Sequence, residues 1–98
     1  MTAVNKSASK VLKVLKALRG HSLKGATNQE IANQLNESPS TITRALQTLV
    51  NEGLAMQEQD GSYTLGTAVV QMAKAHSTEI ERAKARIEEV EKRTAINW

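Results

Sequence analysis

Two helix-start signals stand eleven residues apart in this chain, and they constrain its fold more than any other feature. Thr27 is followed three residues later by Glu30. This is the spacing of a capping box, in which each of the two side chains binds the other residue's backbone N–H. Ser38 is a second N-cap candidate, and Pro39 after it suits the first helical position. We therefore predict a helix of about nine residues, a tight turn, and a further helix that runs to about Glu52.

Recognisable elements flank this pair of helices. Residues 7–19 carry a broad apolar stripe and precede Gly20, which predicts a first helix. Asp60 and Gly61 form a strong hairpin-turn signal between two short strands, expected over residues 54–59 and 62–65. From Thr67 onward we expect one long helix, with a bend near residues 76–78.

Three helices followed by a two-stranded hairpin is the order of a winged helix-turn-helix. The sequence thus predicts a mainly α fold, in which three helices and a β-hairpin wing are followed by a long C-terminal helix. Residues 1–76 are expected to form the winged helix-turn-helix domain, and residues 77–98 a C-terminal helix that serves dimerisation.

The third helix has an outward face that suits a groove better than a plain surface. Its inner face is expected to comprise Ile42, Ala45, Leu46, Leu49 and Val50. The outer face holds hydroxyls, the amides of Gln47 and Asn51, and one guanidinium, with no acidic residue among them. In a helix-turn-helix the later helix enters the major groove, where Ser and Thr contact bases or phosphate, Arg pairs with guanine and Gln with adenine. We predict that residues 39–52 are the recognition helix, with DNA contacts from Ser40, Thr41, Thr43, Arg44, Gln47 and Thr48.

Contacts to the DNA backbone are expected elsewhere in the domain. Besides the lysines of the first helix, the expected phosphate contacts are Lys24, Thr27, Asn28 and Gln29. The wing tip carries two acidic residues and no Lys or Arg, so strong anchoring by the wing is not expected; its candidate polar contacts are Gln57, Gln59 and Ser62.

The charge distribution favours a polyanionic partner for the first half of the chain. The 98 residues carry a net charge of +3. Residues 1–53 hold seven basic and three acidic side chains, a net charge of +4, whereas residues 54–98 hold six and seven, a net charge of −1. A basic half that also contains the outward face described above is consistent with double-stranded DNA.

Several classes of function find no support in the residues. The chain has no Cys, and His21 and His76 lie far apart without partners at ligand spacing, so we expect no metal site and no cofactor. No Gly-rich phosphate loop or nucleophile turn occurs, and we expect no enzyme activity. The apolar runs are too short for a membrane span, and the composition suits the reducing cytoplasm.

A heptad pattern runs along the C-terminal helix. Residues that are mostly apolar or small, with the polar exceptions His76 and Thr94, alternate at spacings of four and three from Val69 to Thr94, and charged residues lie elsewhere. A seam of about four heptads suggests pairing with another helix, and a helix that packs back on its own domain is the alternative. We predict a homodimer that pairs through Ile80, Ala83, Ile87 and Val90. The single Trp of the chain, Trp98, is expected to cap the end of this dimer.

Residues 35–66, LNESPSTITRALQTLVNEGLAMQEQDGSYTLG, resemble the DNA-binding half of IclR-type transcriptional regulators. Those proteins show a Ser-Thr-aliphatic-x-Arg run, a Gly-Leu or Gly-Tyr step, an Asp-Gly hairpin and a Tyr-x-Leu-Gly exit. The matching segments here are Ser40 to Arg44, Gly53-Leu54, Asp60-Gly61 and Tyr63 to Gly66, and the opening SASKVLKVLKAL is similar to the family's first helix. The resemblance covers about residues 7–76.

The resemblance implies a prokaryotic or phage regulator whose dimers pair through the first helix and the helix after the wing. Two departures stand out. Family members often carry Pro-Lys before the Ser-Thr pair, whereas Ser38-Pro39 stands here, so one expected basic contact is missing. Family members also continue into a larger ligand-binding domain, for which 98 residues leave no room, so no small-molecule effector is expected. The rival interpretation is a winged-helix protein-interaction module that docks through its C-terminal helix.

Overall fold

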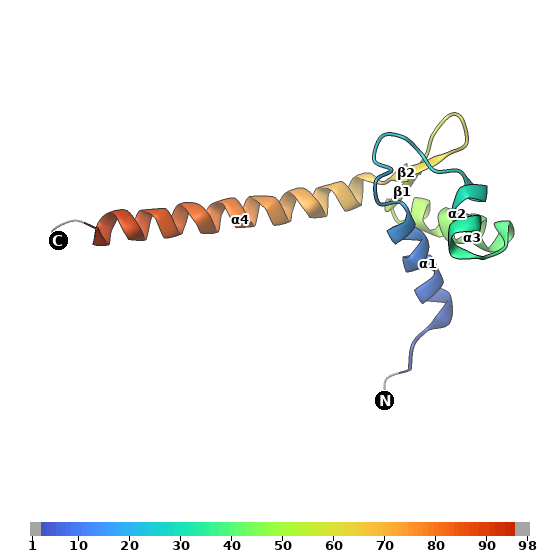
Figure 1. The fold of residues 1–98 in the computed structure, drawn as a ribbon, viewed down its shortest axis with the longest axis horizontal. Helices are drawn as coiled ribbons and strands as arrows, with labels where there is room; N and C mark the ends of the chain where they lie inside the picture. Colours follow the sequence, from blue (N-terminus) through green and yellow to red (C-terminus); the bar gives the residue numbers. More distant parts are fainter. Residues whose placement is uncertain (1–2, 96–98) are drawn as a thin grey trace.

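The elements of the computed structural model, which describes residues 3–95, follow the predicted order (Figure 1). The helices are α1 (Lys6–Ala17), α2 (Asn28–Leu35), α3 (Pro39–Asn51) and α4 (Thr67–Thr94). Strands β1 (Ala55–Gln57) and β2 (Tyr63–Leu65) lie between α3 and α4. This arrangement is a winged helix-turn-helix with a long C-terminal helix, and the predicted fold class is confirmed. Trp98 lies outside the described residues.

α1 is displaced slightly toward the N-terminus from its predicted span of residues 7–19. Asn5 is its N-cap, because the Asn5 side chain accepts a hydrogen bond from the backbone N–H of Ala8 at 3.0 Å. At the other end the backbone N–H of Leu18 donates to the carbonyl of Leu15 at 3.0 Å, which tightens the last turn. The helix therefore stops before Gly20, whose φ of +86° turns the chain away.

The two helix starts that organise the sequence both form as predicted. The backbone N–H of Glu30 donates to the Thr27 hydroxyl at 3.1 Å, and the backbone N–H of Thr27 donates to the Glu30 carboxylate at 2.9 Å. The Ser38 hydroxyl caps α3 by accepting from the backbone N–H of Thr41 at 3.2 Å. Between the two helices, Asn36 has a φ of +55°, a left-handed conformation that Asn tolerates better than most residues.

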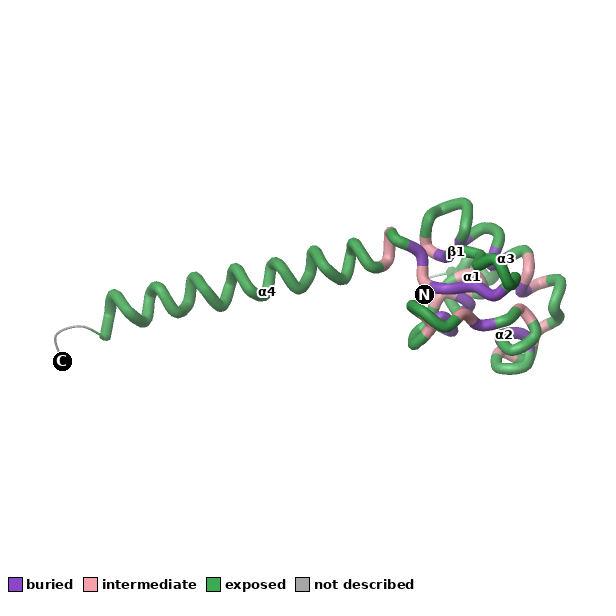
Figure 2. Tube along the Cα trace, turned by 90° about the horizontal axis from the view of Figure 1, so that it is seen from above, coloured by how far each residue is buried: buried purple, intermediate pink, exposed green. Residues whose placement is uncertain are grey.

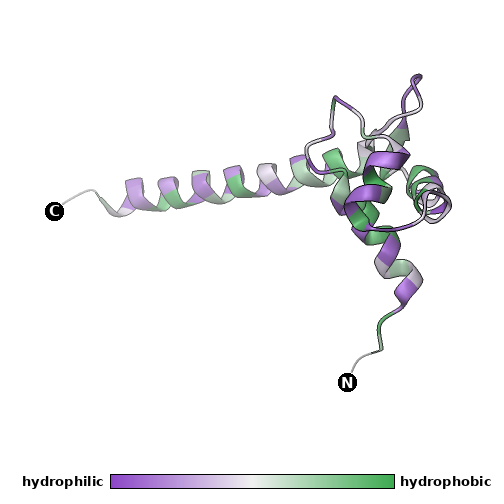
Figure 3. Cartoon of the chain, turned by 45° about the vertical axis from the view of Figure 1, so that its right-hand side comes forward, coloured by the Kyte–Doolittle hydropathy of each residue, from purple (hydrophilic) through white to green (hydrophobic). Residues whose placement is uncertain are grey.

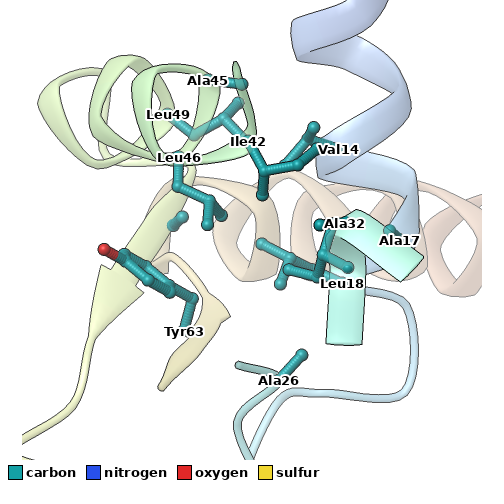
Figure 4. Packing of buried hydrophobic residues seen from close by; sticks show 12 residues of the cluster. Val14, Ala17, Leu18, Ala26, Ala32, Ile42, Ala45, Leu46, Leu49 and Tyr63 are labelled. Carbon is teal, nitrogen blue, oxygen red and sulfur yellow. The ribbon is translucent and has the colours of Figure 1, made fainter. Parts of the chain in front are cut away.

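The core is aliphatic except for Tyr63 and lies where α1, α2, α3 and the strands converge (Figure 4). The largest fully buried side chains are Val14, Leu18, Ile31, Ile42, Leu46 and Leu49. Apolar colour is concentrated on the inward sides of the first three helices (Figure 3). One prediction for the inner face of α3 is wrong, because Val50 is 39% exposed. It lies at the margin of the helix face that the core covers.

The wing is a short hairpin, and both of its strands contact the rest of the domain. β1 and β2 pair antiparallel, with Met56 opposite Thr64, and both are shorter than the predicted strands. The turn is where it was predicted, since the backbone N–H of Gly61 donates to the carbonyl of Glu58 at 3.0 Å. On its other side β2 meets the segment before α2, where Ala26 and Tyr63 exchange two backbone hydrogen bonds of 2.9 and 2.8 Å. This pairing, which the sequence did not indicate, ties the wing to the start of the helix-turn-helix.

α4 leaves the domain as a rod (Figure 1). None of its residues is buried, and it is exposed along nearly its whole length (Figure 2). It therefore does not pack back on its own domain. The bend expected near residues 76–78 is absent, because the helix is continuous from Thr67 to Thr94, a span without Gly or Pro. The predicted domain boundary at residue 76 accordingly falls inside α4.

Candidate nucleic-acid interface

The outward face of α3 presents the predicted side chains at different depths. Ser40, Arg44, Gln47 and Thr48 are exposed. Thr41 and Thr43 are half-buried at the edges of this face. The burial of Ile42, Ala45, Leu46 and Leu49 on the opposite side fixes which residues of the helix face outward. α3 contains no acidic residue, so Arg44 meets no opposite charge from its own helix.

Two predicted DNA contacts are held together inside the helix-turn-helix. The Asn28 side-chain amide donates to the Thr43 hydroxyl and also to the Pro39 carbonyl oxygen at 3.2 Å. Asn28 opens α2, whereas Pro39 and Thr43 lie in the first turns of α3. These hydrogen bonds therefore set the position of one helix start against the other, a function that the sequence did not reveal for Asn28 or Thr43.

The hydroxyls at the start of α3 bind one another and the backbone. The Ser38 hydroxyl donates to the Thr41 hydroxyl at 2.8 Å and lies 3.3 Å from that of Ser40. The Thr48 hydroxyl donates to the backbone carbonyl of Arg44 at 3.0 Å. Most hydroxyls of the face thus already have a partner in the free protein, whereas no hydrogen bond joins the side chain of Arg44 or Gln47 to another of the described residues. These two side chains are free to extend.

A hollow of about 320 Å³ separates the N-terminal part of α1 from α3. It is lined by Ser7, Lys10, Val11, Thr41, Arg44, Ala45 and Thr48. Lys10 also lies 3.4 Å from the Glu37 carboxylate in the turn between α2 and α3. The structure thus places one of the α1 lysines beside Arg44. Ser7, which had no predicted role in binding, lies there as well.

The predicted phosphate contacts surround the start of α2. Lys24 and Gln29 are exposed, and Thr27 is the exposed N-cap. The Lys24 carbonyl oxygen accepts a hydrogen bond from the His21 ring at 2.9 Å, which orders the loop that carries Lys24. Hydrogen bonds from the backbone N–H and the side chain of Thr27 hold the pKa of Glu30 below its ordinary value. The Glu30 carboxylate is therefore engaged in capping the start of α2.

The wing exposes two of its three candidate polar side chains. Gln57 and Gln59 are exposed, but Ser62 is buried. Its hydroxyl and its backbone N–H donate to the Asp60 carboxylate at 2.6 and 2.9 Å, and these hydrogen bonds lower the pKa of Asp60. The Ser62 side chain thus closes the turn and faces the segment at Gly25, and Gln57 and Gln59 are the exposed candidates of the wing.

Two other findings concern the described residues as a whole. No cluster of three or more His, Asp or Glu side chains within residues 3–95 could hold a metal ion. No helix in this part of the chain is long and apolar enough to cross a membrane.

A family model described as the IclR helix-turn-helix domain matches residues 7–59. Among solved structures, an IclR transcriptional regulator from Alicyclobacillus acidocaldarius is 31% identical, with a TM-score of 0.65; the match covers 74% of this chain and 30% of that one. An IclR family regulator from Brucella abortus is 27% identical, with a TM-score of 0.61 and coverage of 74% and 28%.

The likeness to a third structure, HmgR of Pseudomonas aeruginosa, extends over 92% of this chain and 40% of that one, with a TM-score of 0.68. At 24% identity it shows a shared fold alone. This chain spans less than half the length of each of these three proteins. No curated protein sequence matches it significantly.

Proposed function

The chain belongs to the IclR helix-turn-helix family, and from this premise we propose that it is a transcriptional regulator that binds specific double-stranded DNA sequences. α3 is the recognition helix and lies in the major groove. The observation that carries this proposal is the outer face of α3, where Arg44 and Gln47 are exposed, without side-chain partners among residues 3–95, and with no acidic residue on the same helix.

The contacts of this face divide into base readers and supporting groups. Arg44 forms a bidentate hydrogen-bonded pair with guanine, and Gln47 forms one with adenine. The donors and acceptors of these side chains match the edges that the two bases present in the major groove. Ser40 and Thr48 contact neighbouring bases or phosphate through their exposed hydroxyls. Thr43, which binds Asn28, supports the helix-turn-helix geometry from the edge of the face.

Phosphate contacts position the recognition helix in the groove. On one side of α3, the DNA phosphates are contacted by Lys24, Gln29 and the N-terminus of α2. On the other side they are contacted by Lys10 of α1. Thr27 and Asn28 act mainly by ordering this surface through their hydrogen bonds. Helix N-termini and lysines suit phosphate because they combine free N–H groups with positive charge.

The protein acts as a homodimer that pairs through α4. Ile80, Ile87 and Val90 of α4 are exposed in the single chain and are covered in the dimer, together with Ala83. Two recognition helices then read two half-sites that are about one helical turn apart or a multiple of it.

The test is fluorescence anisotropy of a labelled duplex at two salt concentrations, roughly 50 and 200 mM. We expect micromolar binding to random-sequence DNA that weakens steeply with salt. Arg44→Glu should abolish this binding. Lys92→Glu is the matched control, because it replaces a cation with an anion near the far end of α4, and it should bind as the unaltered protein does.

Each outcome decides something. Unchanged DNA binding by Arg44→Glu would show that α3 is not the recognition helix. No binding at either salt concentration would remove the DNA function. The remaining candidate would be a protein-interaction module, which the exposed apolar residues of α4 favour, and a partner protein that binds α4 would then be sought.

A further inference from the structure

The exposed seam of α4 carries information about how two copies meet. Ile80, Ile87 and Val90 are 43%, 59% and 44% exposed, although they are large and apolar. In Figure 3, apolar bands recur along the rod between hydrophilic ones. A helix of 28 residues with such a stripe and no buried residue needs a partner surface to cover it.

The charged residues beside the seam are the second observation. In heptad notation Ile80 and Ile87 occupy a positions, whereas Ala83 and Val90 occupy d positions. The g positions before the two isoleucines are Glu79 and Arg86, and the e positions after Ala83 and Val90 are Lys84 and Glu91. All four charged residues are exposed. They are the positions that set partner choice and orientation in a coiled coil.

Parallel pairing brings unlike charges together at every such contact. In a parallel, in-register dimer each g residue faces the e residue five positions later on the other helix. Glu79 of one copy then meets Lys84 of the other, and Arg86 meets Glu91. Twofold symmetry doubles these contacts, so that four opposite-charge pairs flank the seam and no like-charge pair does.

Antiparallel pairing of the same seam brings like charges together at its centre. With Ile80 of one copy opposite Val90 of the other, the symmetry axis passes near residue 85. In this orientation g positions face g positions and e positions face e positions. The two Arg86 side chains then meet at the centre, as do the two Lys84 side chains, and the opposite-charge contacts are limited to the outer pairs of Glu79 with Arg93. Lys84, which lies 3.6 Å from Glu81 of its own helix, would gain a repulsive neighbour.

We infer that two copies of this chain pair through α4 as a parallel, in-register coiled coil, with Glu79–Lys84 and Arg86–Glu91 pairs between the copies. This inference rests on the homodimer of the proposed function and specifies its direction. α4 is about 42 Å long at 1.5 Å per residue. Parallel pairing places both winged domains at the same end of the rod, where they can share one DNA site, whereas antiparallel pairing would place them at opposite ends.

Single cysteines report the direction, because the chain has none of its own. Ala73 is a seam position, and in the parallel dimer the two residues 73 face each other within disulfide reach. In the antiparallel dimer they lie about 36 Å apart along the axis. Ala85 lies on the outer side of the helix, so Ala85→Cys is the matched control for Ala73→Cys.

With oxidised glutathione as oxidant, Ala73→Cys should form a disulfide-linked dimer and Ala85→Cys should remain largely uncrosslinked. Sedimentation of the reduced proteins establishes that both are dimers before oxidation. A reduced Ala73→Cys dimer that does not crosslink would overturn the parallel direction and leave the DNA function standing. A monomer at all concentrations would overturn both the inference and the homodimer.

Charge exchange tests the pairs themselves. One variant carries Glu79→Lys with Arg86→Glu, and the other carries Lys84→Glu with Glu91→Lys. Each alone should self-associate about tenfold more weakly, because all four contacts become like-charged and exposed pairs are individually weak. An equal mixture should recover the original affinity, because every contact is again between opposite charges. Equal association of the mixture and the separate variants would refute these pairings.

A separate measurement keeps the two proposals apart. The crosslinked Ala73→Cys dimer should bind DNA as the reduced protein does, because the bond joins the copies at the end nearest their winged domains. If it forms in high yield and no DNA binding is seen in either state, the parallel dimer stands and the proposed DNA function fails.

Discussion

Replacing Gly66 by Ala tests how the wing is joined to α4. Gly66 has a φ of −77°, which any residue adopts, so the substitution introduces no backbone strain of its own. A Cβ at this position would lie 2.6 Å from the backbone nitrogen of Ala55 and equally close to the carbonyl carbon of Leu54, and it would overlap the Gly53 carbonyl oxygen. All of these are backbone atoms, and no side-chain rotation relieves the overlap.

The expected magnitude follows from what must move. The backbone N–H of Gly66 donates to the carbonyl of Leu54 at 2.9 Å, and that of Ala68 donates to the carbonyl of Gly53 at 3.1 Å. Losing both hydrogen bonds costs about 2 kcal/mol. Overpacking adds at least about 1 kcal/mol. We expect the free energy of unfolding to fall by about 3 kcal/mol or more, which lowers Tm by at least about 12 °C for a domain of this size.

The assay is thermal unfolding followed by circular dichroism at one fixed protein concentration, because dimerisation makes Tm depend on concentration. Gly20→Ala is the control: Gly20 has no atom within 4 Å of the added Cβ, so the substitution should cost only the strain of its φ of +86°, about 1–2 kcal/mol. A Gly66→Ala protein that melts within about 2 °C of the original would refute the close approach of the wing to the start of α4.

Three further predictions concern the interface and its support. Arg44→Ala should weaken specific DNA binding by about 1–3 kcal/mol and relax the preference at one base pair, whereas Lys24→Ala should weaken binding to all sequences alike and reduce the salt slope by about one; equal effects of both on matched and mismatched sites would contradict this division. Asn28→Ala and Thr43→Val should show a coupling free energy of about 1 kcal/mol in a double-mutant cycle of urea unfolding, because the two side chains are hydrogen-bonded to each other. Additive effects of the two substitutions would show that this hydrogen bond does not contribute to stability. The folded pKa of Glu30 lies below its ordinary value of 4.5, so its carboxylate stabilises the fold above that pH and the contribution is lost as pH falls below it. Glu30→Gln should therefore show a shallower fall of Tm between about pH 5 and pH 3, and identical acid profiles would sink this account.

Local signals in the sequence determined where α2 and α3 begin and how the hairpin turns. The capping box at Thr27, the cap at Ser38 and the turn at Gly61 each depend on hydrogen bonds between residues three positions apart. Such contacts need only the local chain, so they are legible without any knowledge of packing. Together with the apolar periodicity they were sufficient for the fold class, and the family resemblance agreed with them.

The same reasoning identified the outer face of α3 and the seam of α4. A helix with one apolar side has its opposite side defined as well, so the exposure of Arg44 and Gln47 followed from the periodicity. The roles of these side chains in DNA binding, and of Ile80 and Ile87 in pairing, stay predictions. The end of α3 shows the limit of periodicity, since Val50 fits the apolar side but is partly exposed.

Only the tertiary structure decided which polar groups are already engaged. Asn28 and Thr43 are fifteen residues apart and bind each other because α2 and α3 cross at their starts. Ala26 and Tyr63 are paired although a still longer stretch of chain separates them. Ser62, which precedes Tyr63, is buried against the segment at Gly25. A pattern along the chain carries no information about such meetings, because they depend on how whole helices and strands are placed. The sequence therefore defined the elements and their faces, whereas packing decided which of the exposed-looking groups remain free to meet a partner.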